Sequence, residues 1–550
     1  MHNIEELKII NSAKGEVALL RITNFRIPVT DETPIESLAA RRLGLPVQSI
    51  NEVYIVRRAI DARRKNNISF VYSLHVVLNS AEGAVLARLG NDKDVVQLIE
   101  AAGEPVQIGS KSLMHPPVVV GAGPAGLLAA LMLAQQGYRP LLLERGRDVD
   151  RRALDVRQFW QTGQFDANSN VQFGEGGAGT FSDGKLTTRV NDPRMQQVLS
   201  VLVEAGAPPE IKYQHKPHVG TDLLRQVVKN IRQRIIELGG TVRFEATVTD
   251  IIIRSGQLEG LIVNGSQEIP CQTVLFGPGH SARDTYQMLY DRGVAIEAKP
   301  FAIGVRIEHP QELIDRAQYG ALAGHPKLGA ADYALVYHDK TSGRTAYSFC
   351  MCPGGLVVAG ASEEGGVVTN GMSLHARASG IANSALVVNV NPADCGDHPL
   401  SGIEFQRRYE RLAFAAGGMN YFAPVQSVGD FLSGKNGSMQ FSTEATYGPG
   451  VVAADLRRCL PEFVTDTLAG ALPEFGRKIR GFDDPGARMT GVETRTSAPV
   501  RLVRNENCES VSTRGFYPIG EGAGYAGGIM SAALDGVNGA LALMKEYKPS

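Results

Sequence analysis

Apolar and polar positions divide the first 112 residues into short alternating segments. Strands are predicted from the apolar runs Leu7–Ile10, Val17–Ile22, Val53–Val56 and Ile68–Leu78. Two helical patterns lie between or after them, at Pro34–Leu43 and Asp92–Ala102. This alternation is typical of a small α/β sandwich, so we predict an α/β domain of the ferredoxin-like type over residues 1–112. The turn-rich stretch Gly109–Pro117 then serves as a linker.

A strand, a glycine turn, a helix and a second strand follow immediately. Three valines (Val118–Val120) lead into GAGPAG, an apolar helix reaches Gln136, and the strand Leu141–Leu143 ends on an acid. The three glycines permit a tight turn, a close approach of the backbone to a pyrophosphate, and close packing of the helix on the strand. The acid, 23 residues after the first glycine, has the spacing of a ribose ligand. The dinucleotide site predicted from this unit comprises Gly121, Gly123, Pro124, Ala125, Gly126, Glu144 and Arg145.

A second glycine turn, near the C-terminus, indicates which dinucleotide is bound. A short apolar strand after Gly515 leads into Gly520 and Glu521, and a helix begins near Gly528. A carboxylate followed by a helix N-terminus suits a ribityl chain that ends in an electron-poor ring, because the helix dipole stabilises negative charge on the reduced ring. NAD has neither requirement. We therefore predict FAD, and we assign to it Gly520, Glu521, Gly528 and Ile529.

The pairing of these two units resembles the glutathione-reductase-like FAD superfamily. Between them, Thr221–Leu238 has one apolar helical face, and a β-meander runs over residues 242–276. The resemblance implies that the backbone at Val248 faces the adenine. It also implies that the segment with Gly277 and Gly279 contacts the dinucleotide.

The stretch GEGGAGTFSDGKL, residues 174–186, has five glycines and little that could build a core. It would make a poor helix and a poor strand, but its backbone amides can form an anion-binding nest. In FAD proteins of this type, a glycine-rich loop at this place crosses the pyrophosphate and one face of the isoalloxazine. The alternative is a surface loop without a ligand. The residues assigned to the cofactor are Gly176, Gly177, Gly179, Thr180, Ser182 and Lys185.

Five longer motifs make the resemblance more specific. The chain is similar to a family of bacterial FAD-dependent dehydrogenases through NVQFGEGGAGTFSDGKLTTR, KPFAIGVRIEHPQ, YSFCMCPGGLVVAGASEEGGVVTNGMS, GVETRTSAPVRLVR and GEGAGYAGGIMSAALDG. The resemblance covers nearly the whole chain. It implies an α/β fold in which a Rossmann-type FAD-binding domain (113–298 and 487–550) is interrupted by an α+β substrate domain (299–486). It implies an FAD-dependent oxidoreductase and leaves the substrate open.

Candidate catalytic residues come from the predicted substrate domain and the segment after it. Cys350 and Cys352 lie on one face of a predicted strand, where a thiolate beside a flavin could form an adduct or exchange electrons. Such positions are poorly placed for a disulfide, and core packing is the alternative. Arg306 and His309 could bind and protonate an anionic substrate, or could simply belong to a strand before a helix. Arg495 either faces the flavin or substrate or lies on a solvated basic edge.

Composition limits the classes of function. The chain has 43% apolar and 21% charged residues and a net charge of −1, which is typical of a globular protein without a global attraction to nucleic acid or membranes. Six cysteines without a CxxC pair predict no metal site and reduced thiols. The N-terminal sequence has no signal-peptide pattern. We therefore expect a cytoplasmic location and no membrane partner.

Several alternatives stay open at this stage. NAD(P)H could reduce the flavin transiently without a domain of its own. The segment from Gly277 to Glu297 could be a second Rossmann unit, but the meander before it belongs to the FAD half. A basic cluster that includes Arg57, Arg58 and Arg63 allows a nucleic-acid-associated flavoprotein that docks through the N-terminal domain, although interleaved aromatic residues are lacking. FAD could also be purely structural. A small-molecule substrate and a redox protein are the candidate partners.

Overall fold

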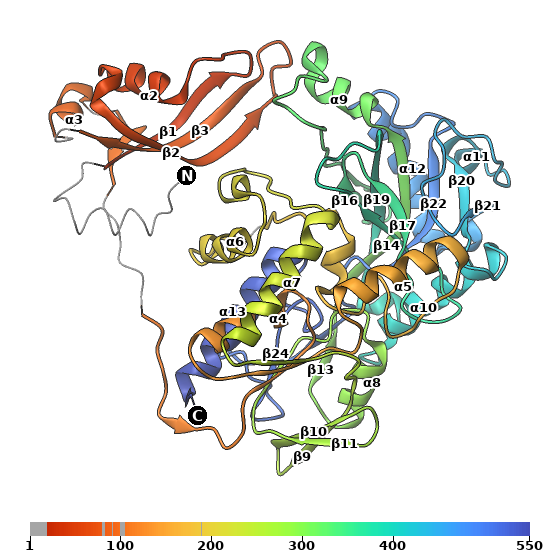
Figure 1. Ribbon diagram of the computed structural model, residues 1–550. Helices are drawn as coiled ribbons and strands as arrows, with labels where there is room; N and C mark the ends of the chain where they lie inside the picture. The colour runs from red at the N-terminus through yellow and green to blue at the C-terminus, as the bar shows by residue number, and fades with distance from the viewer. Residues whose placement is uncertain (1–18, 80–82, 91, 99–104, 189, 550) are drawn as a thin grey trace. The chain divides into compact units, whose positions relative to one another are not determined.

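The computed structural model describes residues 19–79, 83–90, 92–98, 105–188 and 190–549 (Figure 1). The predicted strand Leu7–Ile10 lies outside these residues. The described residues form two compact units. The N-terminal unit comprises the described residues up to Pro105 together with Pro209–Pro217 and Gln318–Gly329, and the main unit comprises the other described residues.

The N-terminal unit has the connectivity βαββαβ. Its elements are β1 (Leu19–Pro28), α2 (Ile35–Leu43), β2 (Ile50–Asp61), β3 (Ser69–Leu78), α3 (Gly83–Leu89) and β4 (Val95–Gln97). The strands are antiparallel in the order β2-β3-β1-β4, which is the arrangement of a ferredoxin-like domain. The prediction of a helix at Asp92–Ala102 is wrong for residues 92–98, which are the part of this segment that the structure describes. Its residues 95–97 pair instead with β1, which satisfies their backbone groups.

Two later segments of the chain complete the N-terminal unit. The backbone of Arg58 donates to the carbonyl of Tyr213 at 2.7 Å and accepts from the amide of His215 at 2.9 Å. The unit ends earlier than the predicted boundary at residue 112. The reason is that β5 (Lys111–Ser112) pairs with β25 (Tyr547–Lys548) of the main unit.

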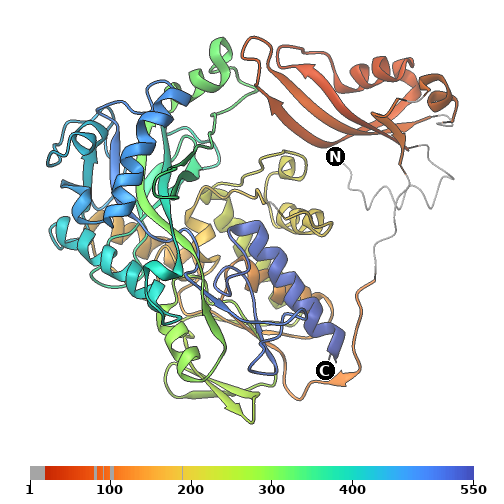
Figure 2. The same ribbon diagram turned by 180° about the vertical axis from the view of Figure 1, so that it is seen from behind.

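A parallel sheet of five short strands lies at the centre of the cofactor half of the main unit. Its order is β24 (Phe516–Pro518), β12 (Val274–Phe276), β6 (Val118–Val120), β7 (Leu141–Leu143) and β8 (Thr241–Arg243). This is the Rossmann-type sheet that the sequence predicts. The helices that lie side by side next to it in Figure 1 are α4 (Pro124–Gln135), α7 (Thr221–Glu237) and α13 (Ile529–Glu546). In Figure 2, α13 is the dark-blue helix that ends at the C-terminus.

A sheet of seven strands forms the second half of the main unit. Its order is β15 (Val336–His338), β16 (Thr345–Cys352), β19 (Ile381–Val390), β14 (Phe301–Pro310), β22 (Arg488–Glu493), β20 (Ala423–Ser427) and β21 (Val451–Ala453). Helix α10 (Ser401–Ala416) packs on β20 and β22, and α12 (Glu462–Lys478) packs on β14, β15, β16 and β19. The predicted boundary at residue 487 is therefore too early, because β22 completes this sheet. The chain enters and leaves through β13 (Ile296–Ala298) and β23 (Val500–Leu502), which pair with each other.

The remaining elements connect these sheets. The meander of the cofactor half is β9 (Val248–Arg254), β10 (Gln257–Val263) and β11 (Gln267–Pro270), and a small hairpin is β17 (Leu356–Ala359) and β18 (Thr369–Met372). The other helices are α5 (Val149–Thr162), α6 (Met195–Glu204), α8 (Arg283–Asp291), α9 (Gln311–Tyr319) and α11 (Val428–Leu432). Among the residues that the structure describes, no helix has both the length and the apolar character needed to cross a membrane.

Candidate functional site

The first glycine turn packs too tightly for side chains. Gly121 has a φ of 92°, and a Cβ atom there would lie 2.1 Å from the carbonyl oxygen of Gly277. A Cβ atom at Gly126 would lie 1.8 Å from the carbonyl oxygen of Gly121. Helix α4 begins at Pro124, and its N-cap Gly123 supplies no side-chain hydrogen bond. The first amides of α4 thus remain available to an anion such as a pyrophosphate.

The buried carboxylate of Glu144 holds the turn and the glycine-rich loop together. It accepts hydrogen bonds from the amides of Ala122 (2.7 Å), Gly146 (2.9 Å) and Gly174 (2.9 Å). A carboxylate offers about four acceptor positions, so one is left for a ribose hydroxyl. Arg145, the next residue, is engaged elsewhere, because its guanidinium bonds to Asp284 at 3.0 Å.

The glycine-rich loop lies across the N-termini of α4 and α13. A Cβ atom at Gly177 would lie 3.0 Å from the Cα atom of Gly123. A Cβ atom at Gly179 would lie 2.9 Å from Cγ1 of Ile529, the first residue of α13. The three glycine motifs, which are far apart in the sequence, therefore meet at one place. This close packing of backbone accounts for the lack of side chains in the loop.

A fully buried arginine that the sequence analysis did not identify holds this loop. The guanidinium of Arg152, in α5, donates to the carbonyl oxygens of Asn170, Val171, Gly174 and Glu175 at 2.6–3.2 Å. Burial lowers the pKa of Arg152 to about 9. An arginine in an amphipathic helix gives no sequence signal for this role, because its partners depend on the loop conformation.

The polar side chains of the glycine-rich loop contact other atoms of the same loop. The hydroxyls of Thr180 and Ser182 donate to carbonyl oxygens within it, at 3.3 and 2.7 Å. The gap between the Lys185 ammonium and the buried carboxylate of Asp183 is 3.8 Å. Cofactor contacts through the side chains of Thr180, Ser182 and Lys185 stay a prediction.

The C-terminal turn packs against the start of α4. The amide of Gly520 donates to Asp535 at 2.6 Å, and a Cβ atom at Gly520 would lie 2.7 Å from Cβ of Ala125. Glu521 accepts from the amide of Gly528 at 3.3 Å. Burial raises the pKa of Glu521 to about 7, which places its titration near neutrality.

Open space faces the N-terminus of α13. Cβ atoms placed at Gly279, Gly527 or Gly528 would meet no described atom within 4 Å. The N-cap Gly528 makes no side-chain hydrogen bond to the helix. An uncapped helix N-terminus beside a glycine-lined opening fits a cofactor that carries negative charge. Together with the remaining acceptor position of Glu144 and the free start of α4, this arrangement fits FAD.

The predicted contacts Val248 and Gly277 lie in different sheets of the cofactor half: Val248 begins a strand of the meander, and Gly277 follows a strand of the parallel sheet. The side chain of Val248 is buried in the core of the cofactor half, and its strand pairs with β10. The amide of Gly277 donates to the carbonyl of Val120 at 2.8 Å, which continues the parallel sheet. The strand after this segment, β13, pairs with β23 and does not join a second parallel sheet. The structure thus agrees with the assignment of Gly277 to the FAD half.

Arg306 is a core residue in this structure, and its predicted catalytic role is not supported. It is fully buried in β14, and its guanidinium forms two bonds to Glu493 in β22, at 3.0 and 3.1 Å. A third nitrogen donates to Asn383 in β19 at 2.8 Å. The ion pair links three adjacent strands of the seven-stranded sheet.

His309 is also part of the core, and its assignment as a catalytic acid gains no support from this position. Its ring is buried, and Nε2 lies 2.7 Å from the carbonyl oxygen of Phe482, which fixes it as the donor. Nδ1 has no partner among the described residues. Burial lowers the pKa of His309 to about 4, so the side chain is neutral at pH 7.

The stability of the protein should therefore fall as the pH drops below about 6.5, the usual pKa of histidine. Between that value and about 4, the unfolded chain binds a proton at His309 that the folded protein excludes. The variant His309→Gln retains a donor for Phe482 without this titration. We expect it to lose less free energy of unfolding between pH 7 and pH 5 than the natural chain, by on the order of 2 kcal/mol. Urea unfolding at both pH values measures this. The exposed His338 in β15, changed to Gln, is the matched control, and an equal effect of both variants would contradict the prediction.

Arg495 is buried as well. The alternative that its side chain lies on a solvated basic edge is therefore wrong. Its guanidinium binds both oxygens of Glu410 at 2.9 and 3.0 Å and donates to Ser281 (2.6 Å) and Ser362 (2.7 Å). Ser281 follows the Gly279 turn of the cofactor half. Arg495 is therefore a positioning residue that ties the cofactor turn to α10.

The two cysteines of β16 are brought together beside polar groups of the cofactor half. The thiol of Cys352 donates to the carbonyl oxygen of Cys350 at 3.3 Å. Its proximity lowers the pKa of the Cys350 thiol to about 5. Arg306 and Lys185 lower it further. The charge of Cys350 in turn contributes to the raised pKa of Glu521. Cys350 thus lies within electrostatic range of both Lys185 and Glu521, although the three residues come from distant parts of the sequence.

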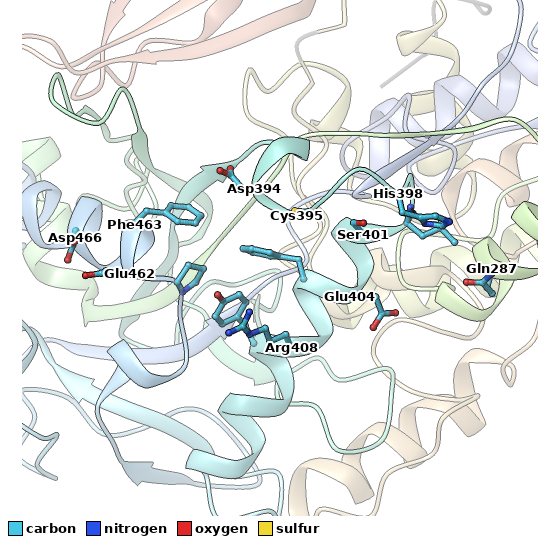
Figure 3. Close-up of a pocket in the computed structure, with 14 residues that line it drawn as sticks. Gln287, Asp394, Cys395, His398, Ser401, Glu404, Arg408, Glu462, Phe463 and Asp466 are labelled. Atoms are coloured by element: carbon cyan, nitrogen blue, oxygen red, sulfur yellow. Dashed lines mark hydrogen bonds between the residues drawn. The ribbon is translucent and has the colours of Figure 1, made fainter.

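A surface groove lies elsewhere on the main unit (Figure 3). It has a volume of about 910 Å³ and is lined by the start of α10, the start of α12 and the segment before them, including His398, Phe405 and Phe463. Its carboxylates Asp394 and Glu404 are already paired with arginines. None of the predicted cofactor or catalytic residues lines this groove, so it is separate from the FAD site.

Comparisons with known proteins agree with this architecture. Family models match at residues 300–496 (FAD-dependent protein, C-terminal domain-like), 119–169 (NAD(P)-binding Rossmann-like domain) and 19–77 (domain of unknown function, DUF8436). An uncharacterised protein of Clostridium beijerinckii is 50% identical over 530 residues, which cover 96% of this chain and 99% of that protein.

Two solved structures are similar at low identity. CtdE in complex with FAD is 12% identical, with 80% of this chain and 84% of that chain covered and a TM-score of 0.32. Glycine oxidase from Bacillus cereus is 9% identical, with 78% and 98% covered and a TM-score of 0.31. The family assignment depends on the C. beijerinckii relative and on the matched domain models: the chain belongs, with that relative, to a bacterial family of FAD-dependent proteins, and FAD is its cofactor.

Proposed function

We propose that the protein is an oxidoreductase that exchanges a hydride or an electron pair between FAD and a small-molecule substrate. The observation that carries this proposal is that Glu521 bonds to Gly528 at the start of α13, where open space faces the helix N-terminus, and that Cys350 interacts electrostatically with both Glu521 and Lys185. A purely structural cofactor would not require the shifted pKa values of Cys350 and Glu521 beside it.

Each of these groups has a role that its chemistry supports. FAD, when bound, supplies the two-electron chemistry. The N-terminus of α13 stabilises negative charge that develops near it. Glu521, with a pKa near 7, can hold or release a proton at neutral pH, and the Lys299 ammonium favours its charged form. Lys185 and the Cys350 thiolate supply charges of opposite sign for orienting a polar substrate.

The visible absorption spectrum, recorded without oxygen before and after addition of NADPH or NADH, tests this function. We expect a flavin band at roughly 450 nm that bleaches with one of the two nucleotides. With Glu521→Gln, the band should persist while the rate of bleaching loses its dependence on pH near 7. A band that neither NADPH nor NADH bleaches would contradict this expectation and favour a structural role for FAD.

The nucleic-acid alternative gains no support from the N-terminal unit. The guanidinium of Arg58 lies over the rings of Phe70 and Tyr213, at 5.3 and 5.4 Å from their centres. Arg63 bonds to Asp61 at 2.6 Å. The basic cluster is thus largely engaged within the unit, and we propose no nucleic-acid partner.

A further inference from the structure

The strand that carries Cys350 and Cys352 is not regular at this point. Strand β16 pairs with β19 in register as far as Phe349, and the register then shifts before Cys352. Cys350 has a φ of 45°, which is uncommon for any residue except glycine. In a regular strand, residues two apart have Cα atoms about 6.6 Å apart, near the upper limit for a disulfide. The expectation that the pair is poorly placed for a disulfide assumes such a regular strand. At the bulge the strand instead turns back on itself, so that Sγ of Cys352 lies 3.3 Å from the carbonyl oxygen of Cys350 and donates to it.

The two thiols differ in accessibility and in charge. Cys350 is partly exposed, whereas Cys352 is fully buried. One nitrogen of Arg306 donates to the carbonyl oxygen of Cys350 at 3.1 Å and lies 4.0 Å from Sγ of Cys352. The interaction between the two cysteine side chains lowers the pKa of Cys350 and raises the pKa of Cys352. At pH 7 this gives an accessible thiolate with a neutral thiol directly beside it.

The other four cysteines lack this combination. Burial raises the pKa of Cys271 and Cys459 to about 12 and that of Cys395 to about 11. Burial also raises the pKa of Cys508. Because the thiolate is the reactive form, Cys350 should react first.

We propose that Cys350 and Cys352 form a reversible disulfide by exchange with disulfides of low molecular weight, so that this dithiol is a second redox centre beside the FAD site. The Cys350 thiolate attacks one sulfur of the small disulfide, forms a mixed disulfide and releases one small thiolate. The Cys352 thiol loses its proton to that thiolate and attacks the sulfur of Cys350. A second small thiolate leaves, so the dithiol is oxidised by two electrons and the small disulfide is reduced to two thiols.

The test counts thiols in the full-length protein with FAD bound, after exposure to glutathione disulfide and denaturation in an alkylating reagent. We expect the natural chain to change from six alkylated thiols to four, with the missing label on the peptide that contains residues 350 and 352. The variant Cys352→Ser should stop at a glutathione adduct on Cys350. The variant Cys350→Ser should keep all five of its thiols.

The variant Cys395→Ser is the matched control, because Cys395 is also partly exposed. This variant should lose two thiols in the same way as the natural chain. The proposal is overturned if the natural chain keeps six thiols, if Cys350→Ser still loses two, or if Cys352→Ser forms no adduct. This readout uses no nicotinamide and no change in the flavin spectrum. A failure of the proposed oxidoreductase function would therefore leave the thiol count unchanged, and the two failures are distinguishable.

Discussion

Gly121→Ala should yield a protein that retains little or no FAD and unfolds at a much lower temperature. Gly121 has a φ of 92°, and the new Cβ atom would lie 2.1 Å from the carbonyl oxygen of Gly277. That oxygen belongs to backbone fixed by the parallel sheet, because the amide of Gly277 donates to Val120. No rotation of a side chain relieves this overlap. We expect a loss of about 3–5 kcal/mol in the free energy of unfolding, together with displacement of the first amides of α4 from the phosphate position.

Gly265→Ala is a control that has the cost of the left-handed backbone conformation without a steric overlap of the new Cβ atom. Gly265 has a φ of 79°, but a Cβ atom there would meet no described atom within 4 Å. This control should cost about 1–2 kcal/mol from the left-handed conformation alone and keep a normal flavin content. The ratio of flavin to protein absorbance and urea unfolding measure both variants. Equal flavin content in the two would show that the turn does not bind the pyrophosphate.

Glu410→Gln should be the second strongly destabilising change. Glu410 is buried in α10 and binds two buried arginines, Arg283 at 2.7 and 2.9 Å and Arg495 at 2.9 and 3.0 Å. The amide keeps the shape of the side chain but leaves both guanidinium groups without their central anion. Breaking a buried ion pair in this way costs about 3–5 kcal/mol. Glu404→Gln, an exposed carboxylate of the same helix, is the control and should change stability by less than about 1 kcal/mol.

The same carboxylate should make the protein sensitive to acid. Burial alone would raise the pKa of Glu410, but the two guanidinium groups outweigh it and hold that pKa well below its ordinary value. Its contribution to stability is thus complete above the ordinary value of about 4.3 and is lost as the pH falls towards the folded-state value. The free energy of unfolding of Glu410→Gln should change less than that of the natural chain between pH 5 and pH 3. Parallel curves for the two proteins would contradict this interpretation.

The parts of the fold whose conformation is determined by residues close together in the sequence could be predicted. The strand, turn and helix around Gly121 have local signals: three valines, glycines where Cβ atoms would overlap, and an acid at the end of the next strand. The same holds for the turn at Gly520 and the helix after it. In these segments the residue types are restricted by backbone contacts within the unit or by a ligand that approaches it.

The roles of buried charges could not be predicted in this way. Arg306 resembles a substrate ligand in the sequence, but its partner Glu493 lies 187 residues further along the chain. Arg495 meets Glu410 only because α10 packs beside the cofactor turn. The irregularity at Cys350 likewise has no sequence signal, since alternation assumes that the strand continues regularly.

The connection between the two halves of the main unit has a consequence for how this architecture can vary. Residues 299–499 leave and return through β13 and β23, which pair antiparallel with each other. The two ends of the insertion are therefore held a strand's width apart, about 5 Å, whatever lies between them. Exchange of this segment would keep the ends in place, but it would remove Gln318–Gly329 from the N-terminal unit and the bond of Arg495 to Ser281. A chimaera that joins at Ala298 and Val500 therefore has to supply replacements for both of these contacts.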